Sequence, residues 1–226
     1  MCLAQLRAVA QTNTQVSPQT SIGARPNIIH IIIDDIGYDD FSSYGSLYYK
    51  TPHIDALAKA GTILTNFYAP HGTCTPTRAA IMTGRYSPRV NDRTGLGVLF
   101  PTDTKGLDSS KEITFTKQLQ KVGYATALVG KWHLGLGTGQ VNWNKKISPS
   151  PNEVGFDYSY IMAATQDRVP TVYIKNGDVV NLDLNDPIEI NYKKNFEGEP
   201  TAISHPEKLN MKWHHGHNNS IVNGVP

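Results

Sequence analysis

The stretch YATALVGKWHLG, residues 124–135, joins an apolar run to two basic side chains. The TALVG part is apolar and rich in strand-forming residues, so it predicts a β-strand that runs into a loop. Lys131 and His133 follow this strand, and because they are two residues apart in extended chain, we expect their side chains on one side. An ammonium beside an imidazole suits an anionic substrate and proton transfer. The alternative is two surface residues that flank a packed tryptophan.

Strand and helix patterns alternate before this stretch. Residues 27–33 (NIIHIII) form a β-branched run typical of a strand buried on both faces, and residues 62–69 are a second strand candidate. Helices are predicted over residues 51–61, 77–84 and 111–123. This alternation predicts an α/β fold with a mainly parallel, or mixed, sheet flanked by helices.

The periodicity weakens after about residue 136. Residues 171–180 (TVYIKNGDVV) predict a β-hairpin, because Asn176-Gly177 separates two apolar runs. Residues 1–25 are polar and predict a disordered tail or the remnant of a secretory leader. Residues 26–226 end without a closing element, so we expect them to form an incomplete domain.

Composition and charge exclude several classes of protein. The net charge of +2 is too small to indicate nucleic-acid binding, and the basic residues are scattered. The two cysteines, Cys2 and Cys74, lie too far apart in sequence to indicate a zinc site or a disulfide framework. No apolar run is long enough to predict a transmembrane segment.

Two further clusters suggest chemistry. Asp34 and Asp35 directly follow the first predicted strand, where paired carboxylates suit a hard cation such as Ca²⁺; a turn with one capping aspartate is the alternative. In CTPTR, residues 74–78, Pro76 suits the first turn of a predicted helix, so Cys74 lies just before the helix N-terminus. The helix N-terminus favours negative charge there, and Arg78 can return a guanidinium to that point. The alternative is a buried structural thiol.

In this order, IIIDDIGYDD (31–40), CTPTRAAIMTGR (74–85) and GKWHLG (130–135) resemble the sulfatase family of cysteine type. The likeness is strongest over residues 27–135, and a weaker one to secreted arylsulfatase-like proteins continues towards the C-terminus. The resemblance implies the alkaline-phosphatase-like fold and an N-terminal portion of a sulfatase catalytic domain over residues 26–226. It also implies a hydrolase of sulfuric esters that acts on aryl or carbohydrate sulfates.

The resemblance implies a role for each matching residue. Cys74 would be oxidised to formylglycine, whose hydrate attacks sulfur. Asp34 and Asp35, together with the modified Cys74, would bind one calcium ion. Arg78 would hold the hydrate. The last two roles fall to Lys131, which would bind sulfate, and to His133, which would assist proton removal from the hydrate.

The implied partners are a sulfated small molecule or glycan and a formylglycine-generating or anaerobic maturase, with no nucleic acid. The full-length parent is expected to be periplasmic or secreted. The second metal-ligand pair and the leaving-group acid of the family have no convincing match; Asn218 and Asn219 do not fit the expected context. We therefore expect the 226-residue chain to be poorly active or inactive.

Alternatives to sulfate-ester hydrolysis stay open. One is hydrolysis of phosphonate or phosphate esters, and another is a non-catalytic remnant that binds an anionic glycan. Gln166, Asp167 and Arg168 could line the substrate pocket, where Arg168 would meet a sulfate or carboxylate, although a loop salt bridge is the simpler interpretation. The histidines at 205, 214, 215 and 217 indicate transition-metal binding only weakly.

Overall fold

A computed structural model describes residues 25–99, 105–165, 168–191, 196, 207 and 221–223. The chain divides into two compact units, Met1–Thr62 and Ile63–Pro226. Within the described ranges, no helix is long and apolar enough to cross a membrane.

The first unit is built around one α-helix. Two 3₁₀ turns, η1 (Tyr38–Asp40) and η2 (Ser42–Tyr44), precede α1 (Pro52–Ala60). The Ser42 hydroxyl donates to Asp55 at 2.6 Å, and the Thr51 hydroxyl donates to the other oxygen of Asp55 at 3.1 Å. These bonds tie the start of α1 to η2, and they confirm the helix predicted over residues 51–61.

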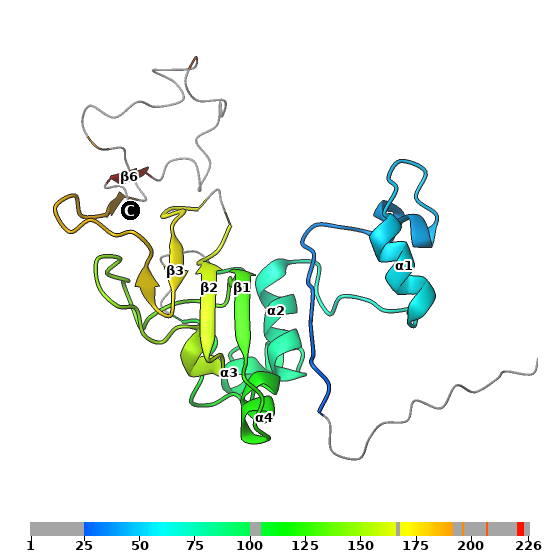
Figure 1. Cartoon of the computed structure of the whole chain (residues 1–226). Helices are drawn as coiled ribbons and strands as arrows, with labels where there is room; N and C mark the ends of the chain where they lie inside the picture. The colour runs from blue at the N-terminus through cyan, green and yellow to red at the C-terminus, as the bar shows by residue number, and fades with distance from the viewer. Residues whose placement is uncertain are drawn as a thin grey trace, which may run out of the picture. The chain divides into compact units, whose positions relative to one another are not determined.

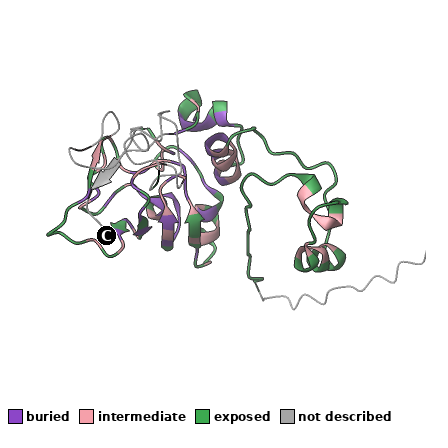
Figure 2. Cartoon of the chain, turned by 90° about the horizontal axis from the view of Figure 1, so that it is seen from above, coloured by how far each residue is buried: buried purple, intermediate pink, exposed green. Residues whose placement is uncertain are grey.

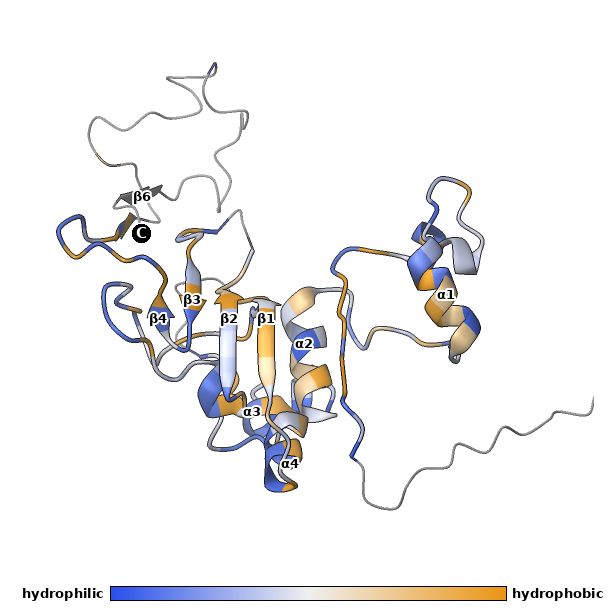
Figure 3. Ribbon diagram, viewed as in Figure 1, coloured by the Kyte–Doolittle hydropathy of each residue, from blue (hydrophilic) through white to orange (hydrophobic). Residues whose placement is uncertain are grey.

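Two predicted strands are wrong. Residues 27–33 and 62–69 have no strand conformation, and Ile29 and Ile31 are 85% and 71% exposed. Figure 3 shows the first of these segments as hydrophobic, and Figure 2 shows it as exposed. A strand needs neighbours that complete its hydrogen-bond ladder, and among the described residues none pairs with either segment. The apolar pattern predicted burial and strand pairing, and the described structure shows neither for these two segments.

The second unit contains a four-stranded sheet in the order β1-β2-β3-β4. The first pair is parallel, and the remaining two pairs are antiparallel. The strands are β1 (Ala127–Lys131), β2 (Tyr158–Met162), β3 (Tyr173–Lys175) and β4 (Asp178–Val179). A separate antiparallel pair joins β5 (Glu189–Asn191) to β6 (Ile221–Asn223).

Helices flank the sheet on the β1 side, as Figure 1 shows. The helices of this unit are α2 (Cys74–Thr83), α3 (Val90–Arg93) and α4 (Phe115–Lys121), and its 3₁₀ turns are η3 (Ser87–Arg89) and η4 (Pro151–Val154). The predicted α/β class with a mixed sheet and flanking helices is confirmed. Parallel pairing is confined, in the residues described, to β1 and β2.

Two local predictions in this unit are also confirmed. Gly84 ends α2 with a φ of 66°, the left-handed conformation in which a glycine commonly follows a helix. The β3–β4 hairpin turns at Asn176 and Gly177, whose φ values are 49° and 90°. Positive φ at both central residues is the requirement of the turn type that matches the twist of paired strands.

The hydrophobic core is formed by side chains of β2 and β3 and of the chain that follows β1. Ile161 and Ile174 are fully buried, and the Trp132 ring packs edge-on against Phe156 with 6.3 Å between centroids. Further buried members of the cluster include Leu134, Leu136, Trp143, Ile147, Val154, Val172 and Val179. The core therefore fixes the segment immediately after β1.

Helix α4 is anchored to η4 by two hydroxyl groups. Thr114 and Thr116 both donate to the carbonyl oxygen of Val154, at 2.6 Å and 3.0 Å. Gly155 follows with a φ of +112°, and a Cβ placed there would lie 2.7 Å from the backbone nitrogen of Lys117. Only glycine permits this approach of η4 to α4.

We expect Gly155→Ala to lower the free energy of unfolding by about 2–4 kcal/mol, since it combines an unfavourable φ with steric overlap. Gly139→Ala is the matched control. Gly139 also has a positive φ, of +127°, but a Cβ there would meet nothing within 4 Å. Urea unfolding of both variants measures the difference, and equal losses would show that the close approach to α4 contributes nothing.

Candidate active site

The candidate site begins where β1 ends. Backbone pairing with β2 continues past Lys131, because the amides of Trp132 and His133 donate to the carbonyl oxygens of Met162 and Ala163, each at 3.0 Å. His133, however, has a φ of 56°, so the chain is not extended there. The argument that Lys131 and His133 share one side of an extended strand is therefore wrong. His133 is 1% exposed and Lys131 is half-buried, so these are not two surface residues.

Cys74 is the first residue of α2 and is half-buried. Thr73 before it is extended, and its backbone amide donates to His71 Nδ1 at 3.1 Å. The Thr77 hydroxyl donates to the His71 carbonyl oxygen at 2.7 Å. Pro76 is buried in the first turn of α2, as predicted. These contacts hold the chain that leads into Cys74 at the open amide end of the helix.

Arg78 joins the two sequence motifs. Its Nη1 donates to the carbonyl oxygen of Lys131 at 2.7 Å, across 53 residues of chain. One end of this bond belongs to the first turn and a half of α2, and the other is the last residue of β1. The structure therefore places the residues at 74–78 and 131–133 in one region, as their proposed common role requires.

Leu99 makes a second connection through its backbone. Its amide donates to the Thr75 hydroxyl at 3.3 Å. Its carbonyl oxygen lies 2.9 Å from His133 Nε2 and 2.5 Å from Arg168 Nη1. Nothing in the apolar side chain of Leu99 predicted this, because the contacts use only its peptide groups.

Arg168 lies against His133, with 2.7 Å between its Nη1 and His133 Nε2. The sequence singled out Arg168 as a possible pocket residue, but gave no reason to pair it with His133. Gln166 and Asp167 lie outside the described residues, as do the four histidines at 205–217 and Asn218 and Asn219.

The surroundings of His133 disfavour its charged form. Burial lowers its pKa from 6.5 to about 4, and the positive charges of Arg168, Lys131 and Arg78 act in the same direction. The Leu99 carbonyl opposes this shift. His133 is therefore neutral at pH 7. Its Nδ1 is buried and has no hydrogen-bond partner within the described part of the chain.

Asp34 and Asp35 belong to the first unit, and both are exposed. Their carboxylate oxygens are suitable ligands for Ca²⁺, so the donor chemistry fits. The number of donors is small: no cluster of three or more His, Cys, Asp or Glu suitable for a metal occurs in the described ranges. The predicted calcium site of Asp34, Asp35 and Cys74 stays a prediction.

An ion pair between exposed Arg85 and buried Glu112 was not predicted from the sequence. Glu112 is 3% exposed; it pairs with Arg85 at 3.0 Å and accepts the Asn91 amide at 2.6 Å. The Asn91 side chain then donates to the carbonyl oxygen of Gly106 at 2.8 Å. Long-range pairs between charged residues carry no periodic signal, so only the fold reveals them.

Gly106 in turn lies directly against Gly135. A Cβ on Gly135 would lie 2.4 Å from the Cα of Gly106. The neighbouring amide of Leu107 donates to the Leu134 carbonyl oxygen at 2.8 Å. Residues 106–107 are thereby packed onto the chain that follows His133.

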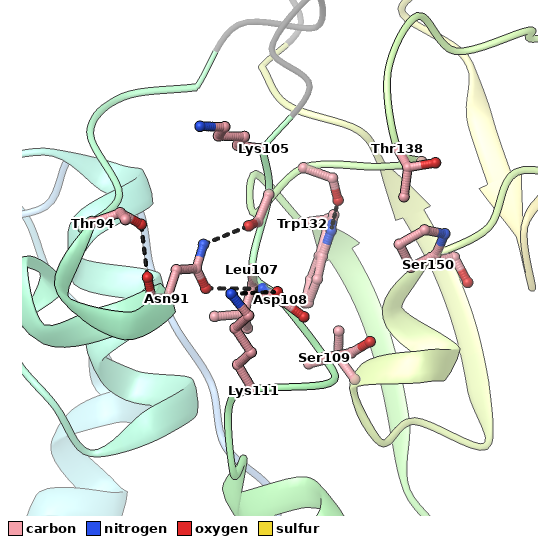
Figure 4. A pocket seen from close by; sticks show the side chains of 15 residues that line it. Asn91, Thr94, Lys105, Leu107, Asp108, Ser109, Lys111, Trp132, Thr138 and Ser150 are labelled. Carbon is pink, nitrogen blue, oxygen red and sulfur yellow. Dashed lines mark hydrogen bonds and ion pairs between the residues drawn. The ribbon is translucent and has the colours of Figure 1, made fainter.

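A cavity of about 320 Å³ opens beside this contact, as Figure 4 shows. Some polar groups of its lining already have partners. Lys111 pairs with Asp92 at 2.9 Å, and the Trp132 indole donates to the Gly135 carbonyl oxygen at 2.7 Å. None of Cys74, Arg78, Lys131 or His133 lines it. This cavity is therefore separate from the candidate site.

A family model described as Sulfatase matches residues 26–181. The chain belongs to the sulfatase family. It is 44% identical, over 203 residues, to an N-acetylgalactosamine-6-O-sulfatase of Bacteroides thetaiotaomicron, covering 89% of this chain and 39% of that protein. Human steryl-sulfatase is 42% identical over 154 residues, which cover 66% of this chain and 26% of the relative. This sulfatase chain therefore spans about two fifths or less of the length of these relatives.

Solved structures agree with this assignment. A structure from work on the metabolism of multiple glycosaminoglycans by Bacteroides thetaiotaomicron matches with a TM-score of 0.78 and 40% identity, over 88% of this sulfatase chain and 43% of that one. Ps i-CgsB in complex with k-i-k-neocarrahexaose matches with a TM-score of 0.54 and 29% identity, over 65% and 35% of the two chains. The predicted alkaline-phosphatase-like fold is confirmed.

We expect stability to fall as the pH is lowered from 6.5 to about 4, because the unfolded chain then protonates His133 while the folded chain resists. His133→Gln should reduce this fall in the free energy of unfolding by about 1–3 kcal/mol. Urea unfolding at several pH values measures it, with exposed His53→Gln as the control. An unchanged pH dependence in His133→Gln would contradict the assigned shift.

Proposed function

We propose that this protein hydrolyses sulfate esters of carbohydrates at a site built on Cys74. The observation that most supports the proposal is the bond from Arg78 to the Lys131 carbonyl, which brings the α2 motif and the end of β1 together. The Bacteroides relative is named a carbohydrate sulfatase, and Ps i-CgsB was solved with k-i-k-neocarrahexaose. These names support a sulfated glycan as the substrate.

Cys74 would act after conversion to formylglycine by a maturase. One hydroxyl of its hydrate would form a bond to sulfur as the substrate alcohol departs. The second hydroxyl would then lose its proton, the C–O bond to the sulfate group would break, and the aldehyde would be restored. The chain contributes the setting for that group: the amide end of a ten-residue helix, which favours negative charge, and a half-buried position. Arg78 adds a fixed positive charge in the same turn region.

Lys131 and His133 would have separate roles in substrate binding and catalysis. The half-buried ammonium of Lys131 would bind the sulfate oxygens, where developing negative charge is stabilised by a positioned cation. Neutral His133 would meet an oxygen of the substrate or of the nucleophile. Its Nδ1 is the ring atom left without a partner in the described residues.

Asp34 and Asp35 would hold a calcium ion together with the oxygen of modified Cys74. The ion would supply positive charge for the oxygens of the sulfate group. Because two carboxylates leave the usual six to eight oxygen ligands incomplete, further ligands are required in the active protein.

We expect a sizeable fraction of Cys74 to become formylglycine when the chain is produced with a formylglycine-generating enzyme. Intact-mass analysis of the Cys74 peptide shows the conversion, and the Cys2 peptide is the internal control. Any modified protein with measurable activity should hydrolyse a chromogenic aryl sulfate faster than the matching aryl phosphonate. Cys74→Ala should abolish hydrolysis of the aryl sulfate. Unmodified Cys74 would refute the proposal, and faster phosphonate cleavage would favour a phosphonate-ester hydrolase.

We expect Lys131→Met to weaken the binding of inorganic sulfate about tenfold, because a charged hydrogen bond is lost. Isothermal titration of the unmodified chain measures this without requiring turnover. Lys145→Met is the control, since Lys145 is exposed and lies outside the site. Equal affinities in Lys131→Met and the unaltered chain would remove Lys131 from the site.

A further inference from the structure

Three atoms from distant parts of the chain meet beside β1. Arg168 Nη1 lies 2.7 Å from His133 Nε2 and 2.5 Å from the carbonyl oxygen of Leu99. His133 Nε2 itself lies 2.9 Å from that carbonyl oxygen. All three distances are within hydrogen-bond range, so the positions of the protons decide which contacts are attractive.

The proton positions follow from the chemistry of the groups. The arginine guanidinium is always charged and only donates, and a carbonyl oxygen only accepts. The contact between Arg168 and Nε2 is therefore attractive only when Nε2 presents a lone pair. If Nε2 carried the proton, it could donate to Leu99 but would face the N–H group of a cation at 2.7 Å.

The first arrangement is favoured because a full positive charge is involved. In it, Arg168 Nη1 donates to both Nε2 and the Leu99 oxygen, and these two charged bonds offset the 2.9 Å contact between the two acceptors. The second arrangement keeps the charged bond from Arg168 to Leu99, but it replaces the other charged bond with a neutral one from Nε2 to Leu99 and adds a contact between two donors. Hydrogen bonds from a charged donor are about twice as strong as neutral ones.

We infer that Arg168 is a positioning residue that fixes His133 as the neutral tautomer with its proton on Nδ1. The consequence for catalysis rests on the proposed function. His133 Nδ1, which is buried and without a partner in the described ranges, then carries the only N–H group of the ring. His133 would begin the reaction as a hydrogen-bond donor to an oxygen.

This arrangement differs from the role implied by the sulfatase resemblance. A base that takes a proton from a hydroxyl needs a free lone pair, and in this tautomer the only lone pair of the ring is held by Arg168. Nearby positive charges also keep the ring from taking up a second proton. Arg168 after β2, Lys131 on β1 and Arg78 on α2 lower the pKa of His133, in addition to the larger effect of burial. The ring is thus held neutral with a defined donor side.

The test is long-range ¹H–¹⁵N correlation spectroscopy on the 226-residue chain with ¹⁵N-labelled histidine. His133→Gln identifies the resonances of His133. We expect the Nε2 shift of an unprotonated ring nitrogen and the Nδ1 shift of a protonated one at pH 7. An Nε2–H tautomer in the unaltered chain overturns the inference, whatever any variant shows.

The variant Arg168→Met tests whether Arg168, rather than the other residues around His133, determines the tautomer. We expect the variant to change to the Nε2–H tautomer, with Nε2 donating to Leu99, and its His133 pKa to rise towards 6.5. Arg89→Met removes an exposed arginine from η3 and should leave the tautomer unchanged. Circular dichroism confirms folding of both. Retention of the Nδ1–H tautomer in folded Arg168→Met overturns the inference.

This experiment needs neither calcium, nor formylglycine, nor substrate. Failure of the tautomer inference therefore leaves sulfate-ester hydrolysis untouched, while an unmodified Cys74 leaves the tautomer result intact.

Discussion

The hydrogen bond from Arg78 to the carbonyl oxygen of Lys131 is the contact on which the candidate site depends. It fixes the start of α2 against the end of β1, and each of these ends contributes chemistry: Cys74 on one, Lys131 and His133 on the other. Leu99 makes a parallel connection through its peptide groups, from Thr75 to His133. Two independent links between the same elements leave little freedom in how the motifs face each other.

Sequence patterns succeeded where a structure is decided by neighbouring residues. The start of α1 after Thr51, the end of α2 at Gly84 and the Asn176-Gly177 turn all follow from local backbone preferences. β1 was also found, because a short apolar run with β-forming residues is a local signal. The family resemblance, carried by the motifs at 31–40, 74–85 and 130–135, identified the sulfatase fold.

Patterns failed where distant chain decides the outcome. The run at 27–33 has the composition of a buried strand, but composition cannot provide the paired neighbours that a strand requires. The even spacing of Lys131 and His133 suggested a shared side, and the left-handed backbone at His133 removed that basis. The ion pair of Arg85 with Glu112 spans 27 residues without any repeating pattern.

The touching backbones of Gly106 and Gly135 have a mechanical meaning. Because no side chain lies between these two backbones, neither can move towards the other without displacing it. A displacement of residues 106–107 would therefore be transmitted through this contact to the segment just after His133, whose side chain is buried.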